Sequence, residues 1–364
     1  MKNDFRILNW NVGGAKYLEL EEYERNIFRQ DLNYELVQLL RKYNPDVVTL
    51  QEIIRYGDSN EEPQEILDQI HGYSYYPFTL IDTYDMSATE KWRKSIDKGK
   101  WKKESYFAQG NGFLFNDKFP TFPVWSLSDG RHYRKDRHYV EKVTLQLGLY
   151  FGNRDTEPRA ALVSHFILRP DVTKEEDLDK MILDVFVINL HLTTLKGERE
   201  GIPKKDGEGS KIRLNQLEAI LHGIVSQYNT WRQAKYQRYE MKSEEKDYDE
   251  DEGITINRYS PLWILAGDFN FTPESVEYET IIRSNFIDCH KDHRGTGTKA
   301  KGMGVEATLT VDYIFAGPKF VSLDPLITEH AIKRNPGPDY MVRISDHYPL
   351  FAHIPLPISI KPYR

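Results

Sequence analysis

The sequence predicts a single α/β domain in which short apolar strands alternate with helices. Three observations predict it. Short apolar runs bounded by turn-forming residues recur from the beginning of the chain to its end. Two longer segments carry apolar residues at helical spacing. Polar stretches separate these elements, but no boundary divides residues 1–364 into two independent cores, and the sequence shows no internal repeat.

The predicted strands share a short apolar run that stops at a polar or turn-forming residue. In chain order they comprise residues 5–12, 46–50, 112–115, 160–166, 184–190, 261–266, 311–315 and 350–354. The run 184–190 is apolar on both faces, which predicts a central strand covered on both sides. Gly13 follows the first run and permits a tight turn there.

Two helices are predicted. The apolar positions of the first are Leu32, Leu36, Leu39, Leu40 and Tyr43. It ends at Asn44-Pro45, because the residue before a proline avoids the α region. Ser210 can cap the second helix. Its apolar stripe comprises Leu214, Leu217, Leu221, Ile224 and Tyr228.

Charged insertions separate the predicted elements. They lie near residues 83–105, 128–158, 196–209 and 235–258. The last of them contains the acidic run 247–252, which lacks the glycine turn and the distant Glu of an EF-hand loop. We therefore expect that run to be a solvated surface rather than a calcium site.

Composition predicts a packed, soluble protein. The hydrophobic share is 39% and the aromatic share 13%, which excludes wholesale disorder. A formal charge of -7 argues against a protein that coats nucleic acid by charge alone. An enzyme can nevertheless bind a polyanion through a local basic groove and a divalent cation.

The cysteine content and the N-terminus predict a cytoplasmic protein. Cys289 is the one cysteine, so no intrachain disulfide can form, and we expect its side chain to be inert packing in a reducing compartment. Charged residues interrupt any apolar run before Leu8, so no signal peptide is expected. No stretch approaches the roughly 20 apolar residues of a membrane span.

Polar residues stand where the predicted strands stop. They are Asn11, Glu52, His191, Asp268, Asn270, Asp312, Asp346 and His347. Strand ends on one edge of a packed pair of sheets converge in space, whatever their separation in sequence. Carboxylate and amide oxygens suit a hard cation such as Mg²⁺, which keeps water positions for a phosphate. The pattern therefore points to metal-assisted hydrolysis of a phosphate ester.

Each of these residues also has a structural explanation when it is taken alone. Glu52 could stabilise a helix N-terminus, and Asp268 could close an Asx turn. Asp346 could cap a turn, and Asn11 could accept a hydrogen bond from the Gly13 amide. Together the set is harder to explain by turn chemistry.

The order of the motifs resembles the endonuclease/exonuclease/phosphatase superfamily. The similar segments are Leu8-Asn9-Trp10-Asn11-Val12, Leu50-Gln51-Glu52, Asn189-Leu190-His191-Leu192, Gly267-Asp268-Phe269-Asn270, Val311-Asp312-Tyr313-Ile314 and Ser345-Asp346-His347. They extend from the first strand to the last. Arg213 and Gln216 also resemble an Arg-x-x-Gln that recurs in the family.

The resemblance implies a four-layer α/β (α+β) sandwich, with two face-to-face mixed β-sheets flanked by helices. It implies that Glu52 ligates a divalent metal, with Asn11 beside it and Asp346 completing the shell. Mg²⁺ is the expected cofactor, and Mn²⁺ is an alternative.

The resemblance also implies catalytic roles. Asp268 would orient or deprotonate the attacking water, and Asn270 would fix that geometry and hold a phosphate oxygen. His347 would pair with Asp312, which sets the tautomer of the imidazole and favours its charged form. His191 would donate a hydrogen bond to a phosphate oxygen.

The expected substrate is DNA or RNA. The segment 131–138 carries Arg131, Arg134 and Arg137 with an interleaved aromatic residue, which suits phosphates and a stacked base, although a solvated loop is the alternative. The segment Asn189-Leu190-His191-Leu192 stands where the exonuclease III branch has Tyr-x-Pro-Asn, which disfavours a repair-type abasic endonuclease. The alternative functions are an inositol-phosphate phosphatase and a sphingomyelinase-type phospholipase C. His290 and His293 have metal-like spacing, but we expect both in a surface loop.

Overall fold

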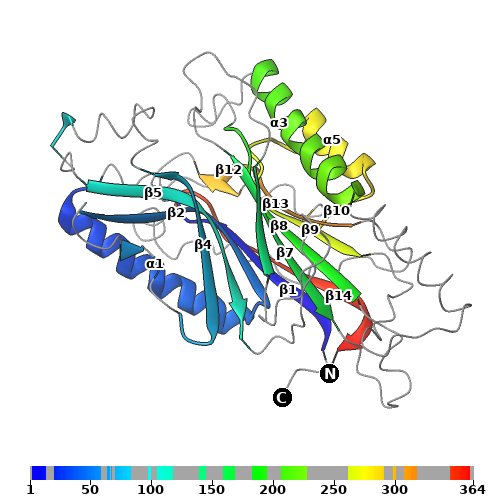
Figure 1. Cartoon of the computed structure of the whole chain (residues 1–364), viewed down its shortest axis with the longest axis horizontal. Helices are drawn as coiled ribbons and strands as arrows, with labels where there is room; N and C mark the ends of the chain where they lie inside the picture. The colour runs from blue at the N-terminus through cyan, green and yellow to red at the C-terminus, as the bar shows by residue number, and fades with distance from the viewer. Residues whose placement is uncertain are drawn as a thin grey trace, which may run out of the picture.

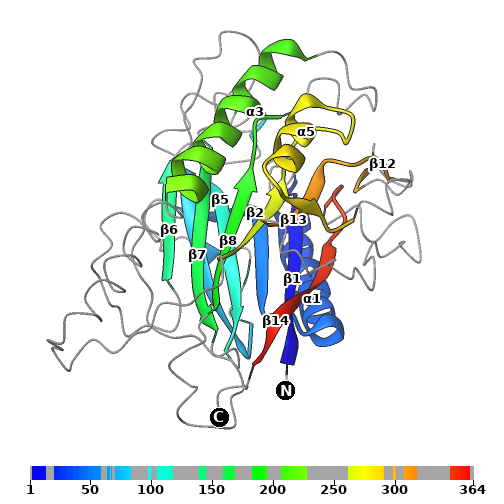
Figure 2. The same cartoon turned by 90° about the vertical axis from the view of Figure 1, so that its right-hand side faces the viewer.

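The computed structural model describes residues 2–13, 20–58, 64–65, 67, 70–82, 97–99, 105–117, 139–144, 159–168, 183–194, 206–227, 261–290, 298–300, 307–317 and 345–360. In these residues two six-stranded mixed sheets pack face to face, with helices on the outer faces (Figure 1). A view turned by 90° looks onto the sheets, whose strands then lie side by side (Figure 2). The predicted four-layer sandwich is confirmed.

The first sheet brings the two ends of the chain together. Its strand order is β14-β1-β2-β5-β4, with β3 beside β2. The bounds are β1 (Lys2–Asn11), β2 (Val47–Asp58), β3 (Gln64–Glu65), β4 (Tyr73–Asp82), β5 (Ser105–Asn116) and β14 (Leu350–Ile360). Strands β1 and β2 are parallel, whereas the other pairs are antiparallel.

The second sheet has the order β10-β13-β9-β8-β7-β6. The bounds are β6 (Tyr139–Thr144), β7 (Ala160–Leu168), β8 (Leu183–His191), β9 (Leu262–Asp268), β10 (Ile287–Asp288) and β13 (Asp312–Gly317). Strands β8 and β9 are parallel. Because β8 lies between β7 and β9 and is buried throughout 185–190, the predicted central strand is confirmed. A small sheet pairs β11 (Lys299–Ala300) with β12 (Ala307–Leu309).

Helices cover the outer face of each sheet. Helix α1 (Glu22–Tyr43) packs on the first sheet and ends directly before Asn44-Pro45, as predicted. Asn44 closes the helix with a left-handed φ of 44°. Helix α3 (Gly207–Ile220) continues as the π-helix η4 (Leu221–Ser226), and together with α5 (Val276–Arg283) it packs on the second sheet (Figure 1). The predicted Ser210 cap is wrong: Asp206 is the cap and accepts from the Gly209 amide at 3.2 Å, because α3 begins four residues earlier than a cap at Ser210 requires.

Strand alternation decides what lies between the sheets. On β8, Val185 and Val187 face the inter-sheet core, whereas Phe186 and Ile188 face the helices. The same inner row of β8 continues to Asn189 and His191. On four other strands the side chains that face the inter-sheet core also change from apolar to polar towards one end of the strand. The polar residues are Asn9 and Asn11 on β1, Gln51 on β2, Asp268 on β9 and Asp312 on β13. The polar ends of several buried rows therefore meet at one end of the sandwich.

Two further expectations concern the region after α5. Cys289 is fully buried in the inter-sheet core, which confirms its packing role. His290 is buried rather than exposed at the surface, and its Nε2 lies 3.2 Å from the Phe351 carbonyl oxygen. His293 lies outside the described residues. None of the helices in the described ranges is long and apolar enough to cross a membrane.

Candidate active site

The carboxylate of Asp268 lies at the centre of the polar end of the sandwich. Its Oδ2 accepts a hydrogen bond from Asn11 Nδ2 at 2.9 Å. The Nε2 atoms of His191 and His347 lie 3.6 and 3.7 Å from the same oxygen. The other oxygen, Oδ1, accepts from the Asn270 amide at 3.1 Å. The Asx turn considered from the sequence is therefore present, and the same carboxylate also contacts three other candidate residues.

Strand register accounts for the neighbours of Asp268 in the second sheet. The parallel β8–β9 pairing places His191 opposite Asp268, and the antiparallel β9–β13 pairing places Asp312 opposite it on the other side. Gly267 permits the close approach of β9 to β8, because a Cβ there would overlap the Leu190 carbonyl oxygen. The three polar side chains therefore project from adjacent strands onto the inner face.

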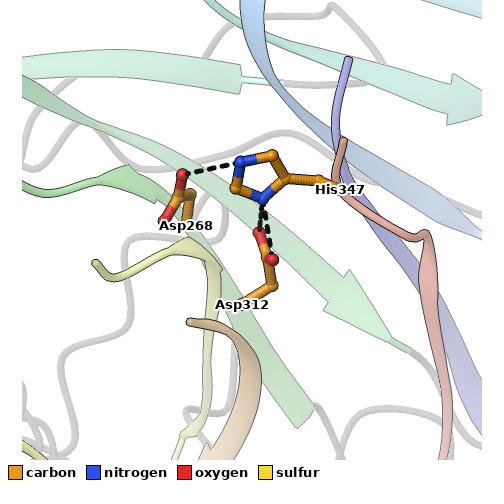
Figure 3. Close-up of side chains that lie close together, drawn as sticks. All are labelled: Asp268, Asp312 and His347. Atoms are coloured by element: carbon orange, nitrogen blue, oxygen red, sulfur yellow. Dashed lines mark hydrogen bonds and ion pairs between the residues drawn. The ribbon is translucent and has the colours of Figure 1, made fainter. Parts of the chain in front are cut away.

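The imidazole of His347 lies between two carboxylates (Figure 3). Its Nδ1 is 2.8 Å from Asp312 Oδ2, and its Nε2 faces Asp268. Because an ionised carboxylate can only accept, Nδ1 carries a proton in this arrangement. Backbone contacts fix the ring further: the His347 amide donates to Ser345 Oγ at 3.0 Å, and its carbonyl accepts from Trp10 Nε1 at 3.0 Å. The structure thus places Asp312 and His347 together, as the resemblance implied.

The first sheet contributes Asn11 and Glu52. Asn11 Nδ2 lies 3.3 Å from Glu52 Oε1, while Asn11 Oδ1 accepts from the Gly13 amide at 2.9 Å. Glu52 stands in a bulge of β2, where the register with β5 shifts between Leu50 and Ile53, and its φ is 57°. A left-handed conformation is uncommon for a residue other than glycine and is often found at functional sites.

Asp346 and Asn270 complete the set. Asp346 Oδ1 lies 4.0 Å from His347 Nε2, and its side chain is 23% exposed, whereas Asp268 and Asp312 are almost fully buried. Asn270 has a φ of 53°, and its Nδ2 donates to the Leu192 carbonyl at 2.9 Å. The side-chain amide of Asn270 is therefore bonded to the backbone that follows β8.

Two sets of residues in this site could hold a cation. Asp268, Asp312 and His347 offer ligand atoms within 4.8 Å of one another. In that set, however, the hydrogen bond from His347 Nδ1 to Asp312 already uses one ligand atom of each partner. Glu52, beside Asn11, and Asp346 supply further hard oxygen donors, and both residues are partly exposed. The chemistry of this second set fits a divalent cation.

Helices α3 and α5 support the site through residues whose task the sequence did not reveal. Gln216 accepts from the Thr193 amide at 3.1 Å and donates to Thr193 Oγ1 at 3.2 Å. Arg213 bonds the Thr193 carbonyl at 3.2 Å and forms a buried ion pair with Glu277 of α5 at 2.9 Å. The Arg-x-x-Gln spacing was the only signal for them. These contacts fix the backbone directly after His191.

The predicted substrate-binding residues Arg131, Arg134 and Arg137 lie outside the described residues. Their role stays a prediction. The eight predicted catalytic and metal-binding residues all lie within the described part of the chain, where contacts of 4.0 Å or less join them into one continuous group.

Comparisons with known proteins agree with this architecture. The model of the Endonuclease/Exonuclease/phosphatase family matches residues 8–347. An endonuclease/exonuclease/phosphatase structure from Beutenbergia cavernae DSM 12333 matches with a TM-score of 0.52 at 16% identity, covering 98% of this chain and 72% of that chain. It supports the fold.

Two further solved structures are similar at lower scores. The human nocturnin catalytic domain with bound sulfate has a TM-score of 0.46 at 15% identity, covering 97% of this chain and 93% of that chain. D. rerio TDP2 complexed with a single-strand DNA product has a TM-score of 0.44 at 15% identity, and the match covers 97% of this chain and 99% of that chain. A search of curated proteins finds no match. The family match extends over nearly the whole chain and includes every motif of the site, so the chain belongs to the Endonuclease/Exonuclease/phosphatase family.

Proposed function

We propose that this protein is a divalent-metal-dependent nuclease that hydrolyses phosphodiester bonds of DNA or RNA. Members of its family are hydrolases that act on phosphoester bonds. The observation that carries the proposal is the buried Asp268 carboxylate, which contacts Asn11 and lies within 3.7 Å of two imidazole nitrogens. A buried carboxylate beside hydrogen-bond donors suits proton transfer and the stabilisation of a charged phosphorane.

Glu52, with Asn11 beside it, and Asp346 would hold Mg²⁺, and Mn²⁺ could take its place. When bound, the cation supplies positive charge that stabilises the developing negative charge on phosphate oxygens. Asn11 donates to both Glu52 and Asp268, so it links this cation site to the catalytic carboxylate.

Asp268 is the proposed base. Its Oδ1 is fixed by the Asn270 amide, which leaves Oδ2 oriented towards the two histidines. In hydrolysis, the water oxygen bonds to phosphorus and its proton passes to Asp268, while the bond to the leaving oxygen breaks. The leaving oxygen keeps the bonding electron pair and takes up a proton from solvent. His191 and His347 would present Nε2 donors to the phosphate oxygens. Asp312 keeps the His347 ring oriented through Nδ1.

Support for a nucleic-acid substrate comes from the sequence. Arg131, Arg134 and Arg137 form a basic segment with an interleaved aromatic residue, which suits a phosphate backbone and a stacked base. We propose that this segment binds the substrate strand.

A substrate panel tests the proposal. Purified protein is incubated with single- and double-stranded DNA, RNA, inositol phosphates and sphingomyelin, in Mg²⁺ or Mn²⁺ and in EDTA. We expect metal-dependent cleavage of a nucleic acid. Asp268→Asn serves as the inactive variant. Asp288→Asn is its control, since Asp288 is a buried carboxylate that contacts Tyr278 and His290 instead of the site. Cleavage of an inositol phosphate or of sphingomyelin alone would overturn the nuclease proposal.

A further inference from the structure

Three buried amide side chains form a bridge between the two sheets next to the site. Asn9 of β1, Gln51 of β2 and Asn189 of β8 are each 0% exposed. Gln51 Nε2 donates to Asn9 Oδ1 at 2.9 Å and to Asn189 Oδ1 at 2.8 Å. Because Asn189 belongs to the second sheet, the latter hydrogen bond crosses the interface. Each of the three residues stands one or two positions before a site residue in the sequence.

Asn189 also bonds the backbone where the β2 bulge begins. Its Nδ2 donates to the Leu50 carbonyl at 3.0 Å and to the Gly112 carbonyl at 2.8 Å. Leu50 and Gly112 are the last register partners before the shift, and Glu52 adopts its left-handed φ of 57° within that bulge. One side chain from the opposite sheet therefore holds both strands at the point where the Glu52 conformation is set.

The bridge is costly for folding. The inner row of β8 places Val185 and Val187 in the apolar inter-sheet core before it reaches Asn189. Within the described residues, Asn9 Nδ2 and Gln51 Oε1 are buried atoms with no hydrogen-bond partner. A buried polar network that is only partly satisfied costs free energy relative to apolar packing. A role in arranging the site accounts for its presence better than stability does.

We propose that Asn189 is a positioning residue that sets the affinity of the site for its divalent cation by fixing the Glu52 bulge from the opposite sheet. The inference rests on the proposed function, in which Glu52 holds that cation. Removing the Asn189 side chain removes both N–H donors of its Nδ2, so the carbonyls of Leu50 and Gly112 lose these hydrogen bonds. Glu52 can then leave its left-handed conformation, so the cation site is no longer preformed.

Calorimetric titration with Mg²⁺ and with Mn²⁺ tests this on the full chain. We expect Asn189→Ala and the isosteric Asn189→Asp to weaken cation binding about 10-fold, the lower end of the effect of groups that orient metal ligands. Asn116→Ala is the matched control. Asn116 is also buried, but its Nδ2 donates to the Pro45 carbonyl at 3.2 Å, away from the bulge. It should lower the melting temperature without changing cation affinity.

A double-mutant cycle separates positioning from general destabilisation. In a Glu52→Gln background, Asn189→Ala should cause no further loss of affinity, because the ligand that it positions is already removed. Unchanged affinity in a folded Asn189→Ala variant, or losses that add fully in the double variant, would overturn the inference. Failure of the wild-type protein to bind either cation would instead contradict the proposed function.

A measurement on the wild-type protein tests the inference even if the Asn189 variants do not fold. Coupling between cation binding and the bridge should slow hydrogen exchange of the Asn189 side-chain amide when Mg²⁺ is added, as followed by ¹⁵N NMR. The Asn116 side-chain amide is the internal reference. Equal protection of the two amides would also overturn the inference.

Discussion

The two sheets present their parts of the site by different structural means. The second sheet supplies His191, Asp268 and Asp312 from adjacent strands at regular ladder positions, and all three are at least nine-tenths buried. The first sheet supplies Asn11 from the end of β1 and Glu52 from a bulge with positive φ. Ladder hydrogen bonds fix the backbone of the first group, whereas the bulge interrupts the ladder at Glu52.

This difference indicates where each part of the site depends on other residues. The second sheet relies on helices α3 and α5, which anchor the segment after His191 through Arg213 and Gln216. The bulge of the first sheet relies on Asn189 from the opposite sheet. Substitutions can therefore perturb the two parts separately, and four predictions follow that separation in order of expected effect.

Arg213→Met removes the anchor of the second sheet and should have the largest effect. It leaves the Glu277 carboxylate buried without its ion-pair partner, which should lower the free energy of unfolding by about 3–5 kcal/mol. Urea denaturation measures the loss. The double variant Arg213→Met/Glu277→Leu should recover only part of the stability, because the Glu277 charge is removed while the buried Asp206 carboxylate, 3.4 Å from Arg213 Nη1, still loses its partner. A loss below about 1 kcal/mol for the single variant would show that the pair does not anchor the sheet.

Asp268→Asn, on β9 of the second sheet, and His347→Ala, whose ring faces Asp268, should abolish hydrolysis while leaving the protein folded. We expect each to lower kcat at least ~100-fold, the usual contribution of a general acid or base. Turnover of a phosphodiester substrate measures the effect, and circular dichroism verifies folding. Near wild-type turnover in either folded variant would remove that residue from the proposed mechanism.

Gly112→Ala should perturb the bulge of the first sheet. A Cβ at this position would lie 2.6 Å from Ile53 Cδ1 and 3.1 Å from the Tyr76 carbonyl oxygen. We expect a stability loss of about 1–3 kcal/mol from overpacking, together with weaker cation binding because Ile53 follows Glu52. Denaturation and calorimetry measure the two effects. Weakened substrate chemistry with unchanged cation affinity would contradict the separation of the two parts.

Cys289 provides the mildest test, since it reports on the core that both sheets share. Burial raises the pKa of its thiol, so the thiolate is disfavoured in the folded protein. We expect no reaction with Ellman's reagent at pH 8 until denaturant is added. The pKa of the thiol is higher in the folded protein than its unfolded value of about 8.5. Ionisation of Cys289 therefore leaves the free energy of unfolding unchanged below that pH and lowers it as the pH rises further. Rapid labelling of the native protein would indicate that the sheets separate.

Much of the fold could be predicted because local patterns agreed with the tertiary structure. The run 184–190 predicted the central strand β8 from its two apolar faces, and Asn44-Pro45 predicted the end of α1. Strand β4 was missed, since it mixes aromatic residues with Pro77 and lacks a clear apolar run. Strand β2 extends beyond Glu52 to Asp58, because the bulge allows pairing to resume after the polar residues.

The candidate site could be anticipated as a set of residues, but not as a geometry. Strand-end placement and motif order selected the residues that meet around Asp268. The sequence could not show that Asn11 would bond both Glu52 and Asp268, since that contact depends on how the sheets face each other. The ion pair of Arg213 with Glu277 and the bond from Gln51 to Asn189 join residues 64 and 138 positions apart. No local pattern encodes such contacts.

The most direct test of the account is the hydrolysis rate as a function of Mg²⁺ concentration for wild type, Glu52→Gln and Asp268→Asn. We expect EDTA to abolish the wild-type rate. Glu52→Gln should raise the half-saturating Mg²⁺ concentration and recover much of its rate at high Mg²⁺, whereas Asp268→Asn should keep the wild-type concentration dependence at a plateau at least ~100-fold lower. A wild-type rate that does not depend on metal, or identical defects in the two variants, would contradict the division of the site between the two sheets.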